Sequence, residues 1–169
     1  MDIHGFKRLH WVNDRFVSPY THTEWDTDFS LVAKCGHDKC SSSPNDNPGD
    51  CMCGIHLAFS VEWLMQEWGG YSRNCDCPTC KSTREYTQTV SCLVAIHANG
   101  KVIVHEKGLR VARARVVSLV QPPPNTYTTD IYGMGLPILS YAEAVEIGER
   151  LTARWGGNDV RIQETDLSY

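Results

Sequence analysis

Seven of the eight cysteines in this 169-residue chain lie between residues 35 and 80. They form three tight groups: Cys35 with Cys40, Cys51 with Cys53, and Cys75 with Cys77 and Cys80. Thiolates so closely spaced, on turns built from Gly, Pro, Asp and Asn, typically present several ligands to one tetrahedral Zn²⁺ ion. The segment therefore predicts at least one structural zinc site, and the rest of the fold must accommodate it.

The first predicted site combines Cys35, Cys51 and Cys53 with a fourth ligand, which is either Cys40 or His37. Spacing alone does not choose between those two. Buried, inert thiols are the alternative, but eight cysteines are many for that role in a chain of 169 residues.

A second zinc is predicted at Cys75, Cys77 and Cys80, where Cys92 or a histidine would complete the ligand set. One shared site that draws on all three cysteine groups is the alternative. A catalytic zinc would leave one position open beside a general-base carboxylate, and neither His-Glu-x-x-His nor His-x-Glu with Cys-x-x-Cys is present. The one or two zinc ions are therefore expected to be structural, and no catalytic residue is assigned.

The compartment follows from the absence of two signals. The first residues have no apolar signal-peptide core, and no run of about 18 apolar residues is present to span a bilayer. We therefore expect a cytoplasmic protein that is not embedded in a membrane, with thiols kept reduced and free for metal. Two disulfides in a secreted chain are the alternative, which the short Cys-x-Cys spacings disfavour.

The first half of the chain predicts a hairpin, two further strands and a helix. Residues 5–12 and 15–17 form the hairpin around Asn13-Asp14, and a short apolar run at 29–33 leads into Cys35. Residues 55–59 read as a buried strand. Ser60 is placed to cap a helix over 61–68, in which Leu64 and Trp68 share the buried face.

The second half predicts a meander followed by a helical tail. Asn99-Gly100 between two β-branched runs is typical of a type I′ hairpin turn, and a second turn at Lys107-Gly108 would give three antiparallel strands over 90–120. Prolines 122–124 end the sheet. The capping-box pattern from Ser140 to Glu143 then predicts an amphipathic helix that ends at 156–157, and residues 160–163 are a candidate last strand.

These elements predict an α+β fold: a small antiparallel sheet with zinc-pinned loops and a C-terminal helix. Residues 1–120 would form one zinc-stabilised β-rich domain with a cysteine-rich insertion at 69–88. Residues 121–169 would form a proline linker and a helical tail packed on that domain.

Charge is unevenly distributed along the chain. The formal net charge is −4, yet Lys107, Arg110, Arg113 and Arg115 form a basic strip. Such a strip suits nucleic acid if all four side chains share one exposed face. A solvated sheet face is the simpler interpretation, and the acidic remainder of the chain favours it.

Two segments of this chain resemble small proteins of actinobacteria and their phages. The segments are Cys51-Met-Cys53-Gly-Ile-His56-Leu-Ala and Val104-His105-Glu106-Lys-Gly108-Leu-Arg110-Val-Ala112, and the likeness extends over roughly residues 5–120. The pattern departs at Leu57, which is inserted before Ala58, and at Leu109, which replaces an aromatic residue. Because no activity is assigned to those proteins, the resemblance implies a small cytosolic β-rich zinc protein, encoded by a phage or its host, and no chemistry.

Three functions are consistent with these observations. The first is a non-enzymatic interaction or regulatory protein, such as a phage accessory or host-takeover factor, in which zinc fixes loops that meet a protein partner. The second is an enzyme, because the strand with His56 before Ser60 loosely resembles ADP-ribosyltransferase-like folds, with Glu106 as a later acid. The third is nucleic-acid binding through the basic strip. For His56 the alternatives are a metal ligand, a catalytic group and a buried core histidine.

Overall fold

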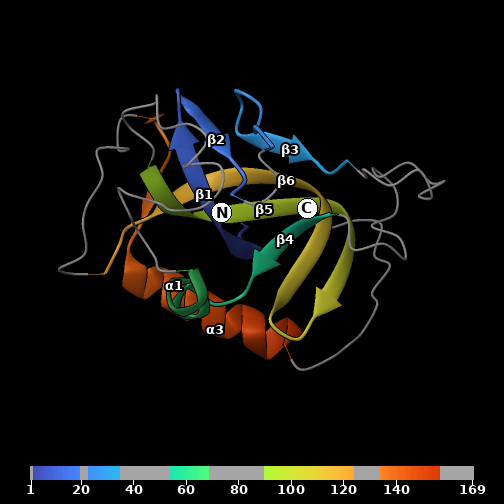
Figure 1. Ribbon diagram of the computed structural model, residues 1–169. Coiled ribbons are helices and arrows are strands. Elements are labelled where there is room, and N and C mark those ends of the chain that lie inside the picture. Colours follow the sequence, from blue (N-terminus) through green and yellow to red (C-terminus); the bar gives the residue numbers. More distant parts are fainter. Residues whose placement is uncertain (1, 20–22, 35–53, 69–89, 124–133, 157–169) are drawn as a thin grey trace.

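The computed structural model describes residues 2–19, 23–34, 54–68, 90–123 and 134–156. Seven strands form one sheet: β1 (Gly5–Val12), β2 (Arg15–Val17), β3 (Ser30–Val32), β4 (Ile55–Ala58), β5 (Val90–His105), β6 (Gly108–Val120) and β7 (Ile138–Leu139). Two helices accompany them, α1 (Val61–Trp68) and α3 (Tyr141–Trp155). All strand pairs are antiparallel except β6 with β7 (Figure 1). The expected antiparallel sheet with one short helix and a C-terminal helix is therefore confirmed.

The predicted N-terminal hairpin is present with the predicted turn. Val12 lies opposite Arg15, and Asn13 and Asp14 have φ angles of 48° and 60°. Positive φ at both central residues is what a type I′ turn requires, and short polar side chains tolerate it better than others. The hairpin is thus specified by its two turn residues.

The predicted turn at Asn99-Gly100 is wrong. β5 continues through both residues and pairs with β6 on either side of them. The register shifts there from Asn99 opposite Arg113 to Val102 opposite Val111, which leaves one extra residue on β5. Gly100 has a φ of 77°, so the left-handed residue forms a β-bulge rather than a turn. The predicted three-stranded meander is therefore one long hairpin, whose turn lies between His105 and Gly108.

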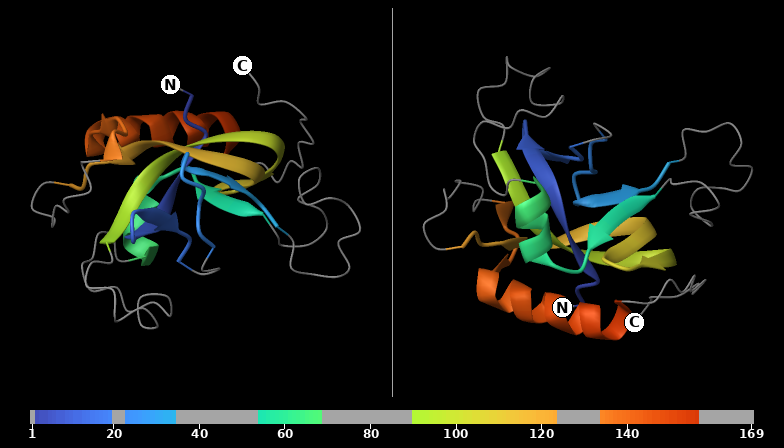
Figure 2. Two further views of the ribbon diagram at one scale, coloured as in Figure 1. Left: turned by 90° about the horizontal axis from the view of Figure 1, so that it is seen from above. Right: turned by 60° about the horizontal axis from the view of Figure 1, so that its bottom comes forward.

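The strand pairings close into a ring. β1 pairs with β5, β5 with β6, β6 with β4, and β4 returns to β1 through the single pair of Phe6 and Ala58. The other edge of β6 is taken in turn by β4, β3 and β7. Figure 2 shows the resulting curved sheet, and in the view of Figure 1 both helices lie below it.

The helices begin where the sequence predicts. The Ser60 hydroxyl accepts a hydrogen bond from the Trp63 amide at 3.1 Å, and Ser140 and Glu143 form a complete capping box. In α3 the buried residues are Ala144, Gly148 and Leu151, whereas Ala142 is exposed.

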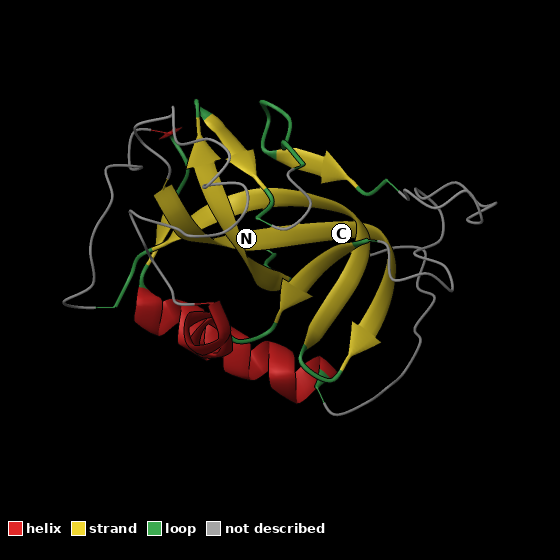
Figure 3. Ribbon diagram, viewed as in Figure 1, coloured by secondary structure: helices red, strands yellow, loops and turns green. Residues whose placement is uncertain are grey.

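The two helices contact each other beside the sheet (Figure 3). Close approach requires glycine at 148, because a Cβ there would lie 2.6 Å from the Phe59 carbonyl oxygen. The predicted strand at 160–163 and the side chain of Trp68 lie outside the described residues. The helical tail therefore packs on the strand-rich body through α1 and β6.

Candidate functional site

A groove with a volume of about 700 Å³ opens where β1 and β4 separate. The two strands pair only at Phe6 and Ala58, so beyond that point the ring of strands has a gap. The described lining comes from β1 (6–8), the segment after β2 (18, 19, 23), β3 and its end (31–34), β4 and its start (54–58), α1 (63, 64) and the β5–β6 connection (105, 107–109). A cavity of this size suits a small-molecule ligand or a short segment of a partner.

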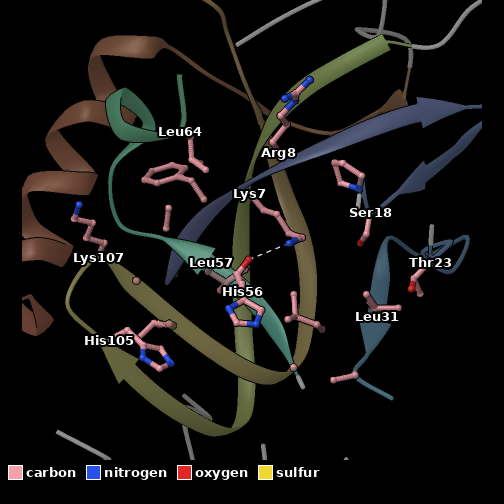
Figure 4. A pocket seen from close by; sticks show the side chains of 18 of the residues that line it. Lys7, Arg8, Ser18, Thr23, Leu31, His56, Leu57, Leu64, His105 and Lys107 are labelled. Atoms are coloured by element: carbon pink, nitrogen blue, oxygen red, sulfur yellow. Dashed lines mark hydrogen bonds between the residues drawn. The ribbon is translucent and has the colours of Figure 1, made fainter. Parts of the chain in front are cut away.

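Lys7 lies in the middle of the groove (Figure 4). Its half-buried side chain crosses the gap between the two strands, and Nζ donates a hydrogen bond of 3.0 Å to the backbone carbonyl oxygen of His56. Burial lowers the pKa of the Lys7 amine from 10.5 to about 8, because removal from water disfavours the charged form. The Lys7 side chain thus bonds a β4 carbonyl group that lies beyond the single backbone pairing of β1 with β4.

Further basic side chains line the same groove. Arg8, Lys34 and Lys107 join Lys7, and the imidazoles of His56 and His105 complete the set; among the described residues, no aspartate or glutamate lines it. Figure 4 shows His105 and Lys107 toward one end of the groove and Ser18 and Thr23 toward the other, with Lys7 and His56 between them. The groove therefore carries a local positive charge on a protein whose formal net charge is −4.

Two of these basic groups have defined environments. Arg8 Nε donates a hydrogen bond of 2.6 Å to the Ser91 hydroxyl, which fixes the guanidinium stem. His105 Nε2 is buried and has no hydrogen-bond partner within the described part of the chain. A buried imidazole nitrogen without a partner is costly unless a ligand or water meets it. His105 lines the groove, but this nitrogen is itself buried.

The remaining walls are largely apolar. They include Leu31, Leu57, Leu64 and the indole of Trp63, and the Lys107 ammonium lies 5.7 Å from the centre of that indole. A cation at this distance from an aromatic face is attracted to it. Apolar walls with basic groups among them suit a ligand that combines an anionic group with an apolar body.

Most of the predicted zinc ligands lie outside the described residues: Cys35, His37, Cys40, Cys51, Cys53, Cys75, Cys77 and Cys80. The exception among the cysteines is Cys92, a buried core residue on β5 whose Sγ donates to the Leu9 carbonyl oxygen at 3.5 Å. Burial raises the pKa of this thiol to about 12. No group of three or more metal-ligating side chains occurs within the described residues.

The other candidate residues are dispersed. His56 is exposed and lines the groove, whereas Glu106 lies in the β5–β6 turn and is not among the described residues that line the groove. In the basic strip Arg113 and Arg115 are exposed, but Arg110 is 5% exposed. The single exposed basic face that nucleic-acid binding would require is therefore interrupted at Arg110.

Sequence reasoning missed Lys7, Arg8 and Lys34. Lys7 and Arg8 lie on β1 and Lys34 follows β3, and the pairings of β1 with β4 and of β3 with β6 bring these distant segments to one groove. The only local signal was Lys7 itself, a long cation immediately after the buried Phe6.

No helix within the described residues has both the length and the apolar character needed to cross a bilayer. Comparison with known proteins gives no further guide to this groove, since no protein-family model, curated protein or solved structure matches the chain.

Proposed function

We propose that the protein is a non-enzymatic binding protein that captures an anionic ligand in the groove between β1 and β4. One observation carries this proposal: four cationic side chains and two imidazoles line the groove, and among the described residues no carboxylate lines it. Most protein surfaces mix charges of both signs, so a concave region with basic groups alone is suited to an anion.

The energetics support binding in this region. Like charges gathered in a half-buried groove repel one another, and an incoming anion relieves that repulsion as well as gaining its own contacts. The groove walls reduce screening by water and salt, so each contact is stronger than on an open surface. Burial of an apolar ligand body against Leu57, Leu64 and Trp63 adds about 25 cal/mol per Å² of apolar area.

We also propose that zinc closes the segment between β3 and β4. Ala33 donates its amide to the Ala112 carbonyl oxygen, and Ile55 lies opposite Val111, so the segment leaves and rejoins the sheet at neighbouring residues of β6. Cys35 follows the first anchor by two positions and Cys53 precedes the second by two. Cysteines that close to two adjacent anchors are well placed in sequence to share one metal ion.

The zinc proposal is tested on protein purified without added zinc or chelator. Elemental mass spectrometry is expected to find one or two zinc ions per chain, and a free-thiol count is expected to find few reactive thiols. Metal-free protein with oxidised cysteine pairs would contradict it. In the setting that the family resemblance implies, a zinc-stabilised binding protein of this kind acts as an accessory factor of a phage within its host.

The anion proposal is tested with an anionic fluorescent probe, 8-anilinonaphthalene-1-sulfonate, and its uncharged analogue N-phenyl-1-naphthylamine. The anionic probe is expected to bind once per chain and to weaken with salt, whereas the uncharged probe is insensitive to salt. The Lys7→Gln variant is expected to weaken binding of the anionic probe roughly tenfold, because one charged contact is lost.

The matched control is Lys101→Gln, since Lys101 lies on β5 outside the described groove lining. This variant is expected to bind both probes as the unaltered protein does, and near-ultraviolet circular dichroism verifies that each variant is folded. Equal binding of the two probes, or equal effects of the two substitutions, would refute an anion site in this groove.

A further inference from the structure

We propose that Lys7 is a nucleophilic amine that captures the carbonyl carbon of a small oxo acid as an imine. The inference rests on the proposed anion groove and names the class of anion that it takes. Its starting point is the position of Nζ, which lies inside the groove and is held at 3.0 Å by a neutral carbonyl oxygen rather than by a carboxylate.

The surroundings of Lys7 make its amine easier to deprotonate than an amine in water. The side chain is half-buried, Arg8 is its chain neighbour, and the other ionisable groups in the described groove lining are basic. Desolvation disfavours an ammonium ion, and it lowers the pKa of this amine to about 8. Amines activated in this way are the usual form of lysines that react with carbonyl compounds.

The groove divides two tasks between different side chains. Once the Lys7 nitrogen is bonded to the carbonyl carbon of the ligand, the carboxylate of that ligand pairs with other cationic groups. Arg8, Lys34 and Lys107 are the candidates for that role. A ligand that satisfies both parts of the site has a carboxylate and, close to it, an aldehyde or ketone carbon.

The reaction is balanced without any other reagent. The Lys7 nitrogen lone pair attacks the carbonyl carbon, and the carbonyl π electrons move to oxygen. The two amine protons then leave with that oxygen as water, and a carbon–nitrogen double bond forms. No oxidation or reduction takes place, and hydrolysis by the reverse route releases the ligand, so the step provides reversible capture rather than turnover.

The experiment uses glyoxylate as the probe, with cyanoborohydride to reduce the imine to a stable amine at pH 7.5. Peptide mapping by mass spectrometry is expected to find one carboxymethyl group on Lys7. Labelling of Lys7 is expected to be at least about tenfold faster than labelling of Lys101, because a much larger fraction of an amine with a lowered pKa is uncharged. The α-amino group, which ordinarily titrates near pH 8, is separated from Lys7 by the same mapping.

Two further measurements bear on the same step. The rate of Lys7 labelling is expected to reach half of its maximum near pH 8, and propanal, which lacks the carboxylate, is expected to label Lys7 more slowly at low salt. The Lys7→Arg variant keeps the charge, so it is expected to lose the label at this position and to retain binding of the anionic fluorescent probe within about threefold.

The outcomes separate the two proposals. Labelling spread over the lysines according to exposure, with a rate that rises only above pH 9, overturns imine formation while the anion groove stands if the fluorescent probe still binds. Loss of both selective labelling and salt-sensitive probe binding overturns both. The pH profile is measured on the unaltered protein, so the inference stays testable even if Lys7→Arg does not fold.

Discussion

Two groups of titratable side chains, one just before β1 and one in the groove that β1 lines, are in opposite circumstances. Near the N-terminus, His4 is buried and its Nδ1 accepts a hydrogen bond of 3.0 Å from the Ala98 amide. The His97 ring lies 4.8 Å away, and its Nδ1 donates to the Asp2 carbonyl oxygen at 3.1 Å. In the groove, by contrast, Lys7 and its basic neighbours have like charges beside them and a neutral carbonyl as the one partner described for the amine.

The difference separates stabilising groups from binding groups. Both histidines are hydrogen-bonded to backbone groups of the protein, and these bonds hold the start of β1 against β5. Nitrogens that already have partners are less suited to bind a ligand. The described lining of the groove gathers basic side chains with no carboxylate among them, an arrangement that an anion complements. The comparison can be tested from both sides.

The largest effect is expected from Gly108→Ala. A Cβ at this position would overlap the Leu57 carbonyl oxygen, and no flexible side chain is available there to move aside. β4 must then shift from β6, so we expect a loss of about 3 kcal/mol in the free energy of unfolding together with loss of probe binding in the groove. Urea unfolding measures the loss of stability, and fluorescence titration measures the loss of probe binding. Unchanged binding would show that the groove does not depend on the position of β4 against β6.

The next effect is a fall in stability at acid pH, which reports the buried histidines. Burial lowers the pKa of His4, and it lowers the pKa of the fully buried His10 to about 4. A histidine with a depressed folded-state pKa stabilises the protein fully above its unfolded value of about 6.5, and the contribution is lost as the pH falls toward 4. For His10 alone we expect a loss of up to roughly 3 kcal/mol, measured by urea unfolding between pH 7.5 and 4.5.

His10→Gln is the variant that checks the assignment, because it removes one titrating group and should flatten the dependence of stability on pH.

The groove is expected to respond at alkaline rather than acid pH. Lys7 loses its charge as the pH rises through about 8, so affinity for the anionic probe should fall between pH 7 and 9, where histidine stability is constant. A single pH range for both effects would contradict the separation of the two groups.

The smallest effect is expected from Gly100→Ala, a substitution limited by backbone conformation rather than by space. The nearest atom to a Cβ there is 3.7 Å away, but the φ angle of 77° is unfavourable for alanine. We expect a loss of about 1 kcal/mol and unchanged probe binding, since the bulge lies outside the described groove lining. A change in groove affinity would reveal coupling along the β5–β6 hairpin.

The sequence predicted the elements that depend on neighbouring residues. The Asn13-Asp14 turn, the Ser60 cap and the Ser140 capping box are all decided within about four positions of the chain, and all are present. Asn99-Gly100 has the same kind of local signal, but it forms a bulge because β6 is long enough to pair on both sides of it. A positive φ angle was predicted correctly at Gly100, whereas the direction of the chain after it was not.

The groove could not be predicted, because it depends on partners that are far apart in the sequence. Phe6 meets Ala58 because β1 pairs with β5, β5 with β6 and β6 with β4, and the gap beyond that pair follows from the way in which the sheet curves. Strand β7, which pairs with β6 through two residues, was missed for the same reason. The cysteine groups fall outside the described residues, so the zinc prediction stays a prediction.

The register of β3 and β4 on β6 also has a consequence for protein engineering. Ala33 and Ile55 occupy consecutive places opposite Ala112 and Val111, so the two strands are in effect one strand with an insertion between its halves. Joining Ala33 directly to Ile55 would restore an uninterrupted strand without changing the pairing of either half. The same point is therefore a natural cassette boundary, where inserts of different length and sequence can be exchanged while the sheet keeps its connectivity.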